Sequence, residues 1–350
     1  MSQAVQSLSV VIPVFNGRLH LSRCLAALAK SNLRVLECIV VDDGSSDGSS
    51  EVAAAYGATV ISTGGRRGPA AARNLGAAAS TGDILVFLDA DVSVHSDTLG
   101  RIRKRFMSDA ALDALIGSYD DTPADPGVVS LYKNLQHHYV HQHGRAEANT
   151  FWTGCGAIRR DVFIEAGGFD EGYPRPCIED IELGYRLRNA GRRIALDTRI
   201  QVQHRKHWSF RGLLHTDIFD RALPWTRLIL KSGVLPNDLN VAMPERISAL
   251  ALMATLPLTA LSPRYPALLS LAAALILLTV LLNRRFYSFL AKRGGWKLAG
   301  AGVLLHFLYY IYSSLSFGAG FLIHLVAGEQ PSARASFPAV ENAKSASAPR

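Results

Sequence analysis

Two aspartates spaced by one residue, Asp89 and Asp91, directly follow the apolar run ILVFL at residues 84–88. Such a run is typical of a strand buried on both faces of a parallel sheet, and its end carries both carboxylates to the edge of that sheet. Carboxylate oxygens suit Mg²⁺ or Mn²⁺, which bind one or two carboxylates together with substrate phosphates. A metal there would neutralise the charge that develops on a leaving diphosphate. Acidic pairs at strand ends also occur in solvated turns, so the pair needs support from its surroundings.

A second acidic pair, Asp42 and Asp43, follows another apolar run at residues 37–41. Part of this segment is a turn, in which Ser46 or Asp47 can cap the next helix. A cap needs only one carboxylate, however. An additional carboxylate at a strand end can accept hydrogen bonds from a nucleotide base or from ribose hydroxyls.

A third acidic pair, Glu179 and Asp180, opens a predicted helix at residues 178–190, after a Gly- and Pro-rich loop at 167–176. This loop can project the pair into a cleft. A carboxylate in a cleft can act as a general base that takes a proton from a hydroxyl group. Adjacent carboxylates raise one another's pKa, so Glu179 would tune Asp180. The alternative is that these residues only favour the helix N-terminus.

The elements that must position these residues alternate regularly over the first ninety residues. Continuous apolar runs predict strands at 8–14, 37–41, 59–62 and 83–88, and helical spacing predicts helices at 19–31, 47–56 and 69–80. This rhythm predicts a doubly wound α/β sheet, in which ligands gather at the carboxyl ends of the strands. The pattern then loosens, with helices expected at 98–109 and 128–143, strands at 114–119 and 192–202, and a small-residue turn around 154–156.

Five segments occur in a characteristic order: VVIPVFN (10–16), VVDDGSSD (40–47), GPAAARNLGAAASTGDILVFLDADV (68–92), GCGAIRRDVFIEAGGFDE (154–171) and EDIELGYRLRNAG (179–191). This ordered set resembles the family-2 inverting nucleotide-sugar glycosyltransferases of the GT-A fold. The resemblance covers about residues 7–205. It implies a GT-A type doubly wound, mostly parallel sheet that binds a nucleotide sugar.

The resemblance also implies roles for single residues on the donor side. Pro13 would flank the nucleotide, Asp43 would contact the base, and Arg73 would lie beside the nucleotide. Asp89 would contact ribose or metal, and Asp91 would be the principal ligand of Mg²⁺ or Mn²⁺.

On the acceptor side, the resemblance makes Asp180 the catalytic base. His204 follows the strand expected at 192–202, where related enzymes often place a histidine on the metal, although a surface histidine is the alternative. The processive polymerases of this family carry a Q-x-x-R-W element. The corresponding segment here, QVQHRKHW at 201–208, does not have that spacing, which favours transfer of one sugar at a time.

Two further groups have open interpretations. Trp152 and Gly154, with Glu179, are expected on the acceptor side, because small residues allow close backbone approach; plain turn geometry is the rival interpretation. Four histidines at 137, 138, 141 and 143 could bind a metal. With few carboxylates or cysteines nearby, they are better interpreted as part of a solvated or membrane-facing helix.

Three apolar stretches, at 247–261, 267–282 and 298–326, indicate membrane helices. The first two are short for a span of about 20 residues, and the brief connection at 262–266 predicts a helical hairpin. Lys and Arg are dense at 283–297, so the positive-inside rule places residues 1–245 and 283–297 in the cytoplasm and the tail outside. A buried helical bundle is the alternative.

These patterns divide the chain into four parts. Residues 1–207 form the glycosyltransferase domain, and 208–245, with aromatic residues among Arg and Lys, form interfacial amphipathic helices or, alternatively, soluble core helices. Residues 246–327 form the membrane region of about three helices, and 328–350, rich in Ala, Ser and Pro, a disordered tail.

Composition excludes several classes. The net charge of +8 could indicate nucleic acid, but much of the excess lies beside the apolar stretches and at 205–211, which fits a membrane surface better. The four cysteines form no CxxC, and the N-terminus carries no signal peptide pattern. We therefore expect no nucleic acid partner and an integral protein of the cytoplasmic membrane with a reduced, cytoplasmic catalytic domain.

Together these observations predict metal-dependent transfer of a sugar, with inversion, from a UDP- or GDP-type donor. The acceptor would be a hydroxyl or phosphate of a lipid-linked or membrane-proximal molecule. A polyprenyl-phosphate glycosyl synthase differs only in its acceptor and remains open. A nucleotidyltransferase should show a Gly-rich loop with a basic residue after the first strand, and a non-catalytic nucleotide-sugar sensor would not need both Asp91 and Asp180.

Overall fold

The computed structural model describes residues 6–233 and 239–327. Its first part has four parallel strands that alternate with three helices, as predicted. The strands are β1 (Leu8–Val14), β2 (Glu37–Asp42), β3 (Thr59–Ser62) and β4 (Ile84–Leu88). The helices are α1 (Arg18–Ala29), α2 (Ser49–Ala55) and α3 (Pro69–Ala79).

The remaining strands complete one sheet with the order β3-β2-β1-β4-β7-β6-β8-β5. They are β5 (Val92–Val94), β6 (Ala114–Tyr119), β7 (Cys155–Arg159) and β8 (Ile194–His204). Strand β7 is antiparallel to β4 and β6, β5 is antiparallel to β8, and β6 and β8 are parallel. The doubly wound, mostly parallel sheet is therefore confirmed. The turn expected around 154–156 is wrong, because this segment enters strand β7.

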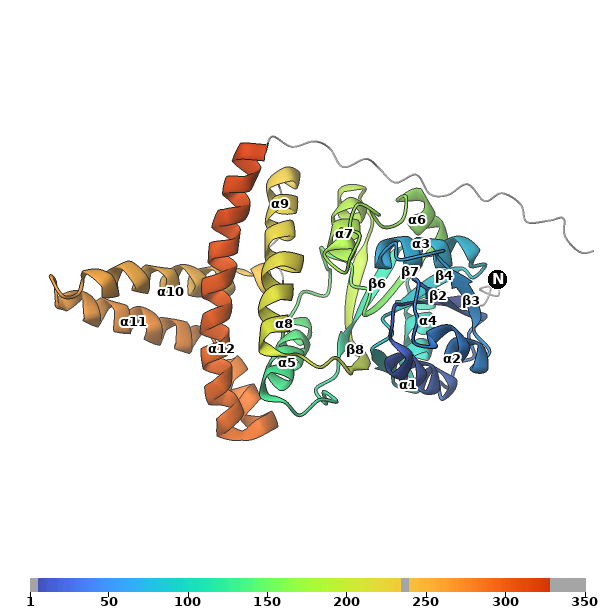
Figure 1. The fold of residues 1–350 in the computed structure, drawn as a ribbon, viewed down its shortest axis with the longest axis horizontal. Coiled ribbons are helices and arrows are strands. Elements are labelled where there is room, and N and C mark those ends of the chain that lie inside the picture. Colours follow the sequence, from blue (N-terminus) through green and yellow to red (C-terminus); the bar gives the residue numbers. More distant parts are fainter. Residues whose placement is uncertain (1–5, 234–238, 328–350) are drawn as a thin grey trace, which may run out of the picture.

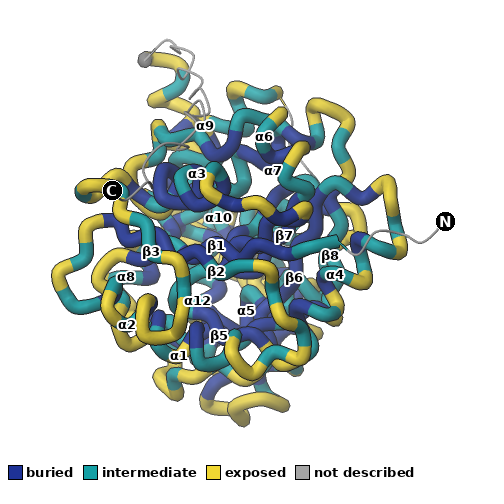
Figure 2. Tube along the Cα trace, turned by 90° about the vertical axis from the view of Figure 1, so that its right-hand side faces the viewer, coloured by how far each residue is buried: buried dark blue, intermediate teal, exposed yellow. Residues whose placement is uncertain are grey.

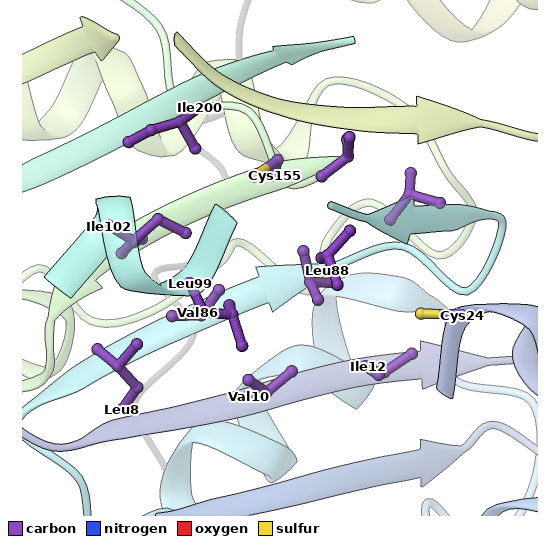
Figure 3. Packing of buried hydrophobic residues seen from close by; sticks show 14 of the residues in the cluster. Leu8, Val10, Ile12, Cys24, Val86, Leu88, Leu99, Ile102, Cys155 and Ile200 are labelled. Carbon is purple, nitrogen blue, oxygen red and sulfur yellow. The ribbon is translucent and has the colours of Figure 1, made fainter. Parts of the chain in front are cut away.

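Helices cover the sheet on both faces. They are α4 (Thr98–Ser108), α5 (Val128–Gln142), α6 (Arg160–Glu165) and α7 (Glu179–Asn189). Neighbouring residues of β1 serve opposite cores: Val10 and Ile12 pack with α1 and α4, whereas Val11 packs with α3. Figure 3 shows Val10 and Ile12 beside Val86 and Leu99 in the first core. Figure 2 shows the central strands buried and the connecting loops exposed around them. Burial on both faces explains why these strands are continuously apolar.

A helical region follows the sheet. It consists of α8 (Phe210–His215), the π-helix η1 (Thr216–Ala222), α9 (Leu223–Ser232), the 3₁₀ turn η2 (Leu239–Val241), α10 (Met243–Leu261), α11 (Ala267–Leu282) and α12 (Arg284–Ala327). Trp208 and Leu213, expected at a membrane interface, are buried in a core formed with α5 and α12. Phe210 and Phe219 are exposed.

All three apolar stretches are helical, and α10 and α11 form the expected hairpin. Helix α12 begins earlier than predicted, and its two parts meet at Gly294 and Gly295, which have non-helical backbone angles. The hairpin projects sideways from α12, which runs alongside α9 (Figure 1). The hydroxyl of Tyr310 joins the hairpin base to α12, through Glu245 Oε2 at 2.6 Å and Asn283 Oδ1 at 3.1 Å.

In the described part of the chain, one helix, Arg284–Val326, is long and apolar enough to cross a membrane by length and composition. One third of its most apolar window is buried inside the protein. Helix α11 is apolar but shorter. The tail expected to be disordered, 328–350, lies outside the described residues.

Candidate active site

The two carboxylates after β4 line one cavity of about 200 Å³ but have different partners. Asp89 Oδ1 accepts a hydrogen bond from Arg73 Nη2 at 2.7 Å. Asp91 Oδ2 instead lies 3.5 Å from Nε2 of His204. The structure therefore separates the pair into one carboxylate bound to an arginine and one that faces a histidine.

Strand pairing brings His204 to Asp91 across 113 residues of sequence. Val92 of β5 is the register partner of His204 at the end of β8. The next residue, Arg205, donates its backbone N–H to the carbonyl of Asp91 at 2.8 Å. Strand β5 was not predicted, so its role in joining the acidic pair to His204 was not foreseen.

Asn134 of α5 orients the His204 ring. Its side-chain oxygen lies 2.7 Å from His204 Nδ1 and also accepts from Trp208 Nε1 at 3.3 Å. Because the indole N–H can only donate, the Asn134 atom in this position is the oxygen. His204 Nδ1 therefore carries a proton and donates it to Asn134, which holds the ring with Nε2 facing Asp91. Tyr119 stacks on the imidazole at 4.1 Å with an interplanar angle of 8°.

Electrostatics also distinguish the two aspartates. Burial acts to raise the pKa of Asp91, but the charge and hydrogen bond of His204 outweigh it and lower this pKa to about 2. For Asp89, burial raises the pKa, and the charge of Arg73 offsets only part of that effect. Asp91 is thus the better anionic ligand of the two.

The donor set partly fits a divalent cation. Asp91 and His204 offer one carboxylate oxygen and one imidazole nitrogen at the same point. Over residues 6–233 and 239–327, no three His, Cys, Asp or Glu side chains converge where a metal could sit. Two protein ligands suffice for Mg²⁺ or Mn²⁺ when substrate phosphates supply the rest. Three residues were predicted to bind the metal: Asp89, Asp91 and His204. Of these, Asp89 accepts a hydrogen bond from Arg73 and does not face His204.

Arg73 ties the end of β4 to the start of α7. Besides Asp89, it donates through Nη1 to Glu179 Oε1 at 2.8 Å, and its side chain is only 5% exposed. Its guanidinium also lies 5.7 Å from the ring centre of Phe169. Arg73 lines the cavity, as expected for a residue beside a nucleotide, but both of its terminal nitrogens are engaged by carboxylates.

Asp180 faces the same cavity, next to Glu179. Its Oδ2 accepts from the backbone N–H and the hydroxyl of Thr153, at 3.2 and 3.3 Å. Burial, followed by the charge of Glu179, raises the pKa of Asp180 to about 6, and Arg73 offsets part of the rise. A carboxylate with this pKa is suited to take a proton near neutral pH. Glu179 also lines the cavity, but it accepts from Arg73 and, through Oε2, from the backbone N–H of Cys177.

Trp152 and Gly154 act together. The indole of Trp152 lines the cavity and meets the rings of Tyr119 and His141 edge-on, each at 4.7 Å. A Cβ on Gly154 would come within 2.4 Å of that indole. Gly154 therefore makes room for Trp152 and is not itself part of the cavity wall.

Asp43 and Pro13 lie outside this cavity. Asp43 Oδ1 accepts from the backbone N–H of Arg67, and Oδ2 accepts from that of Gly68, both at 2.8 Å. Gly68 has a φ of +96°, and a Cβ there would meet the carbonyl of Pro174 at 2.4 Å. Asp43 thus fixes the loop before α3 against the loop before α7. Pro13, on β1, is the register partner of Val41.

The loops after β1 and β2 interlock at the same sheet edge. Asn16, with a φ of +47°, accepts from the backbone N–H of Ser46, and its own N–H donates to Ser45 Oγ. Asp47 accepts from the backbone N–H groups of Arg18 and Ser49. The helix α2 nevertheless has Gly48 at its N-cap, so the prediction of Ser46 or Asp47 there is wrong.

Sequence reasoning missed several residues of the cavity wall: Tyr119, His137, His141, Lys206 and Arg221. It also missed Asn134. The solvated or membrane-facing interpretation of the α5 histidines is wrong for those at 137, 138 and 141, because α5 packs against the sheet. The spacing of 134, 138 and 141 on one helical face was the available signal.

Comparisons with known proteins agree with this geometry. Residues 9–167 match the family model described as "Glycosyl transferase family 2". The 4,4'-diaponeurosporenoate glycosyltransferase of Staphylococcus haemolyticus is 37% identical over 33% of this chain and 29% of its own length. The pre-mycofactocin glycosyltransferase of Mycobacterium tuberculosis is 31% identical over 57% of this chain and 43% of its own length. The chain thus spans less than half the length of either relative.

Among solved structures, the mannosyltransferase PcManGT of Pyrobaculum calidifontis, in complex with GDP-Man and Mn²⁺, is similar with a TM-score of 0.51 and 19% identity. The similarity covers 93% of this chain and 88% of that one, so it includes the helical region as well as the sheet. The expected GT-A type sheet followed by a helical region is confirmed. Residues 9–167 thus resemble a glycosyl transferase family 2 domain, and the similar proteins named here are glycosyltransferases.

Proposed function

We propose that the protein transfers a sugar, with inversion, from a nucleotide-diphosphate donor to a lipid-linked or membrane-proximal acceptor. One observation carries this proposal: Asp91, His204 and Asp180 face a single cavity although they come from three distant segments. The cavity combines a site suited to a metal-bound diphosphate with a carboxylate suited to remove a proton.

The donor is proposed to be of the UDP or GDP type. The similar mannosyltransferase was solved with GDP-Man and Mn²⁺, which supports a nucleotide-sugar donor and a divalent metal. Asp43 would contact the base and Pro13 would flank the nucleotide. Both lie at the carboxyl ends of central strands, where ligands of such sheets bind.

Asp91 and His204 would hold Mg²⁺ or Mn²⁺, with Asp89 contacting ribose or the metal. When bound, the metal supplies positive charge against the leaving diphosphate. Asn134 keeps His204 Nε2 directed at Asp91. Arg73 holds Asp89 and Glu179 in place, which fixes the distance between donor and acceptor sides.

Asp180 would act on the acceptor. It takes the proton of the acceptor hydroxyl while the oxygen bonds to the anomeric carbon and the bond from that carbon to the diphosphate breaks. Thr153 orients the carboxylate, and Trp152 forms the floor beside it. An acceptor phosphate would react as an anion and would not need this proton transfer.

For the membrane, we propose that the α10–α11 hairpin inserts into the cytoplasmic membrane, with the catalytic domain on the cytoplasmic side. Large apolar side chains are exposed along the hairpin, including Leu250, Leu256, Leu269, Leu277 and Leu281. At a rise of 1.5 Å per residue, the 16-residue α11 is roughly 24 Å long, shorter than the hydrocarbon thickness of about 30 Å, so the hairpin would enter most of the layer.

The direction of α12 argues against three parallel spans. The helices of the hairpin run across the direction of α12 (Figure 1). In this arrangement, α12 and the hairpin would not both lie parallel to the membrane normal. With the hairpin inserted, α12 would lie along the membrane surface. Arg284 and Arg285 begin α12, one residue after the end of α11, and are exposed, so they would meet the lipid headgroups.

A donor screen tests the function. Purified protein with Mn²⁺ should release nucleotide diphosphate slowly from one class of UDP- or GDP-sugar, because water can replace the acceptor. Mass spectrometry of membrane glycolipids, with and without the protein, then identifies the product. No release from any UDP- or GDP-sugar, together with unchanged glycolipids, would contradict the proposal.

A further inference from the structure

Two cations in the cavity wall have no carboxylate partner among the described residues. Lys206 and Arg221 both line the cavity, and neither has an Asp or Glu oxygen within 4.0 Å in the described ranges. The Lys206 ammonium lies 4.1 Å from the ring centre of Trp208. Arg221 Nη1 lies 2.9 Å from His137 Nε2. Buried or half-buried cations are usually paired, so this arrangement calls for an anion.

The neighbouring side chains do not supply that anion. Burial lowers the pKa of His137 well below its usual range and that of His141 to about 4, so both are neutral. Asp220 also lines the cavity, but its carboxylate lies 3.6 Å from Arg175 and 3.9 Å from His215. The charges of Asp91 and Asp89 act on Lys206 from within the cavity, but no carboxylate of the described residues forms an ion pair with either cation, and a metal at Asp91 would offset those charges.

A buried ion pair lies close to Arg221 on the same helix. Asp217, four residues earlier on η1, accepts from Lys133 Nζ at 2.8 Å and from the hydroxyl of Tyr312 at 2.6 Å. These contacts fix Asp217 to α5 and α12, so its carboxylate is engaged although the charge of Arg221 also lowers its pKa. The Arg221 guanidinium instead contacts His137 in the cavity wall.

Arg221 lies on the side of the cavity that leads to the helical region, whereas Lys206 follows β8 beside the segment that is bonded to Asp91. Arg221 belongs to η1, which continues into α9, and α9 packs along α12 (Figure 1). Trp208 and Trp225 form the adjoining wall. The acidic groups follow β4 and begin α7, and Asp91 among them is close to Lys206.

We propose that Lys206 and Arg221 bind an anionic group of phosphate class on the acceptor. This inference rests on the proposed function and names its acceptor class: a phosphorylated amphiphile that enters from the membrane side. The donor diphosphate has the same chemistry, but its charge would be met by a cation at Asp91 and His204. Lys206 and Arg221 are then left for a second phosphate.

Tryptophan fluorescence can report on this site, since Trp152, Trp208 and Trp225 line the cavity and Trp296 lies on the exposed surface of α12. The full chain, in a neutral detergent, is titrated with dodecyl phosphate and with dodecanol. Dodecyl phosphate should change the tryptophan fluorescence in a saturable way, whereas dodecanol, which lacks the phosphate, should give no saturable change. Arg221→Gln and Lys206→Gln should each weaken dodecyl phosphate binding about tenfold, as expected for loss of a charge-assisted hydrogen bond.

Controls separate the alternatives. Arg227→Gln removes the same charge from an exposed position on α9 and should bind dodecyl phosphate like the wild type. Arg221→Lys keeps the charge and should recover most of the affinity, which excludes simple misfolding. Affinity for UDP or GDP with Mn²⁺, measured by calorimetry, should change less than threefold in Arg221→Gln.

Two results would overturn the inference. One is equal binding of dodecyl phosphate by the wild type, Arg221→Gln and Arg227→Gln. The other is a parallel loss of nucleotide diphosphate affinity in Arg221→Gln, which would assign these cations to the donor. Failure of the proposed function would give a different result. The wild type would then release no nucleotide diphosphate from donor sugars, whether or not it binds dodecyl phosphate.

Discussion

Arg73 Nη1 donates to Glu179 Oε1 at 2.8 Å, and both side chains are 5% exposed. These residues stand 106 positions apart in the sequence. The same guanidinium holds Asp89, so one buried arginine connects the carboxylate that ends β4 with the acidic start of α7. The relative position of the donor and acceptor sides depends on this connection.

Arg73→Gln should therefore destabilise the catalytic domain. Removing one partner of a buried ion pair leaves an uncompensated charge and costs about 3–5 kcal/mol. The measurement is the melting temperature, followed by near-ultraviolet circular dichroism. Arg67→Gln is a matched control, because Arg67 forms an exposed pair with Glu171 at 2.9 Å and should shift melting little. Equal melting of the two variants would contradict the structural role of Arg73.

Much of this framework was readable from sequence, because β1 and β4 are buried on both faces and are therefore continuously apolar. Strand β5 was not readable, since it has only three residues and pairs with a strand more than a hundred positions later. The apolar residues around Asp89 and Asp91 likewise gave no sign that the two aspartates would have different partners. Arg73 selects one of them only through tertiary packing.

The misinterpretation of α5 has a similar cause. Its histidines resemble an exposed polar face in the sequence, but β6, β8 and α12 pack against this helix. His137 then contacts Arg221, 84 residues later. Asn134 carries no signal of its own, because its partner His204 lies 70 residues away.

Asn134 should control metal affinity through His204. Asn134→Ala removes the acceptor for His204 Nδ1–H, and the freed imidazole can adopt other tautomers and orientations. Loss of such a partner typically weakens metal binding about 10–100-fold. Titration with Mn²⁺ in the presence of nucleotide diphosphate, followed by electron paramagnetic resonance, gives the affinity.

Two controls accompany this titration. Asn134→Asp retains an acceptor and should recover part of the affinity. Excess EDTA should stop turnover in the wild type. Full turnover in EDTA, or unchanged Mn²⁺ affinity in Asn134→Ala, would contradict the metal site at Asp91 and His204.

The pH profile should reveal Asp180. A base must be ionised to accept a proton, and burial beside Glu179 raises the pKa of Asp180 to about 6. The transfer rate to a hydroxyl acceptor should then fall about tenfold per pH unit below pH 6 and level off above it. Nucleotide affinity should not fall with the transfer rate below pH 6, because Asp180 would act on the acceptor and not on the donor. A flat profile between pH 5 and 7 would exclude Asp180 as the base.

Membrane topology tests the proposed position of α12. If only the hairpin inserts, reporters fused at Met1 and after Arg350 should lie on the same, cytoplasmic side. A cysteine introduced in the hairpin tip, Ser262→Cys, should be protected from a cytoplasmic maleimide. Reporters on opposite sides would instead support three spans, as the positive charge at 283–297 suggests.

The most direct test of the mechanism compares Asp180→Asn with Asp43→Asn. Asp180→Asn keeps shape but cannot accept the proton, so transfer at saturating donor should fall roughly 10²–10⁴-fold while nucleotide affinity stays within a few-fold. Asp43→Asn should weaken nucleotide binding first, because Asp43 would contact the base and holds the loop before α3. The measurement is calorimetric affinity for nucleotide diphosphate beside the transfer rate for each variant. If Asp180→Asn loses nucleotide affinity but keeps its rate at saturation, Asp180 is not the base, and the account is wrong.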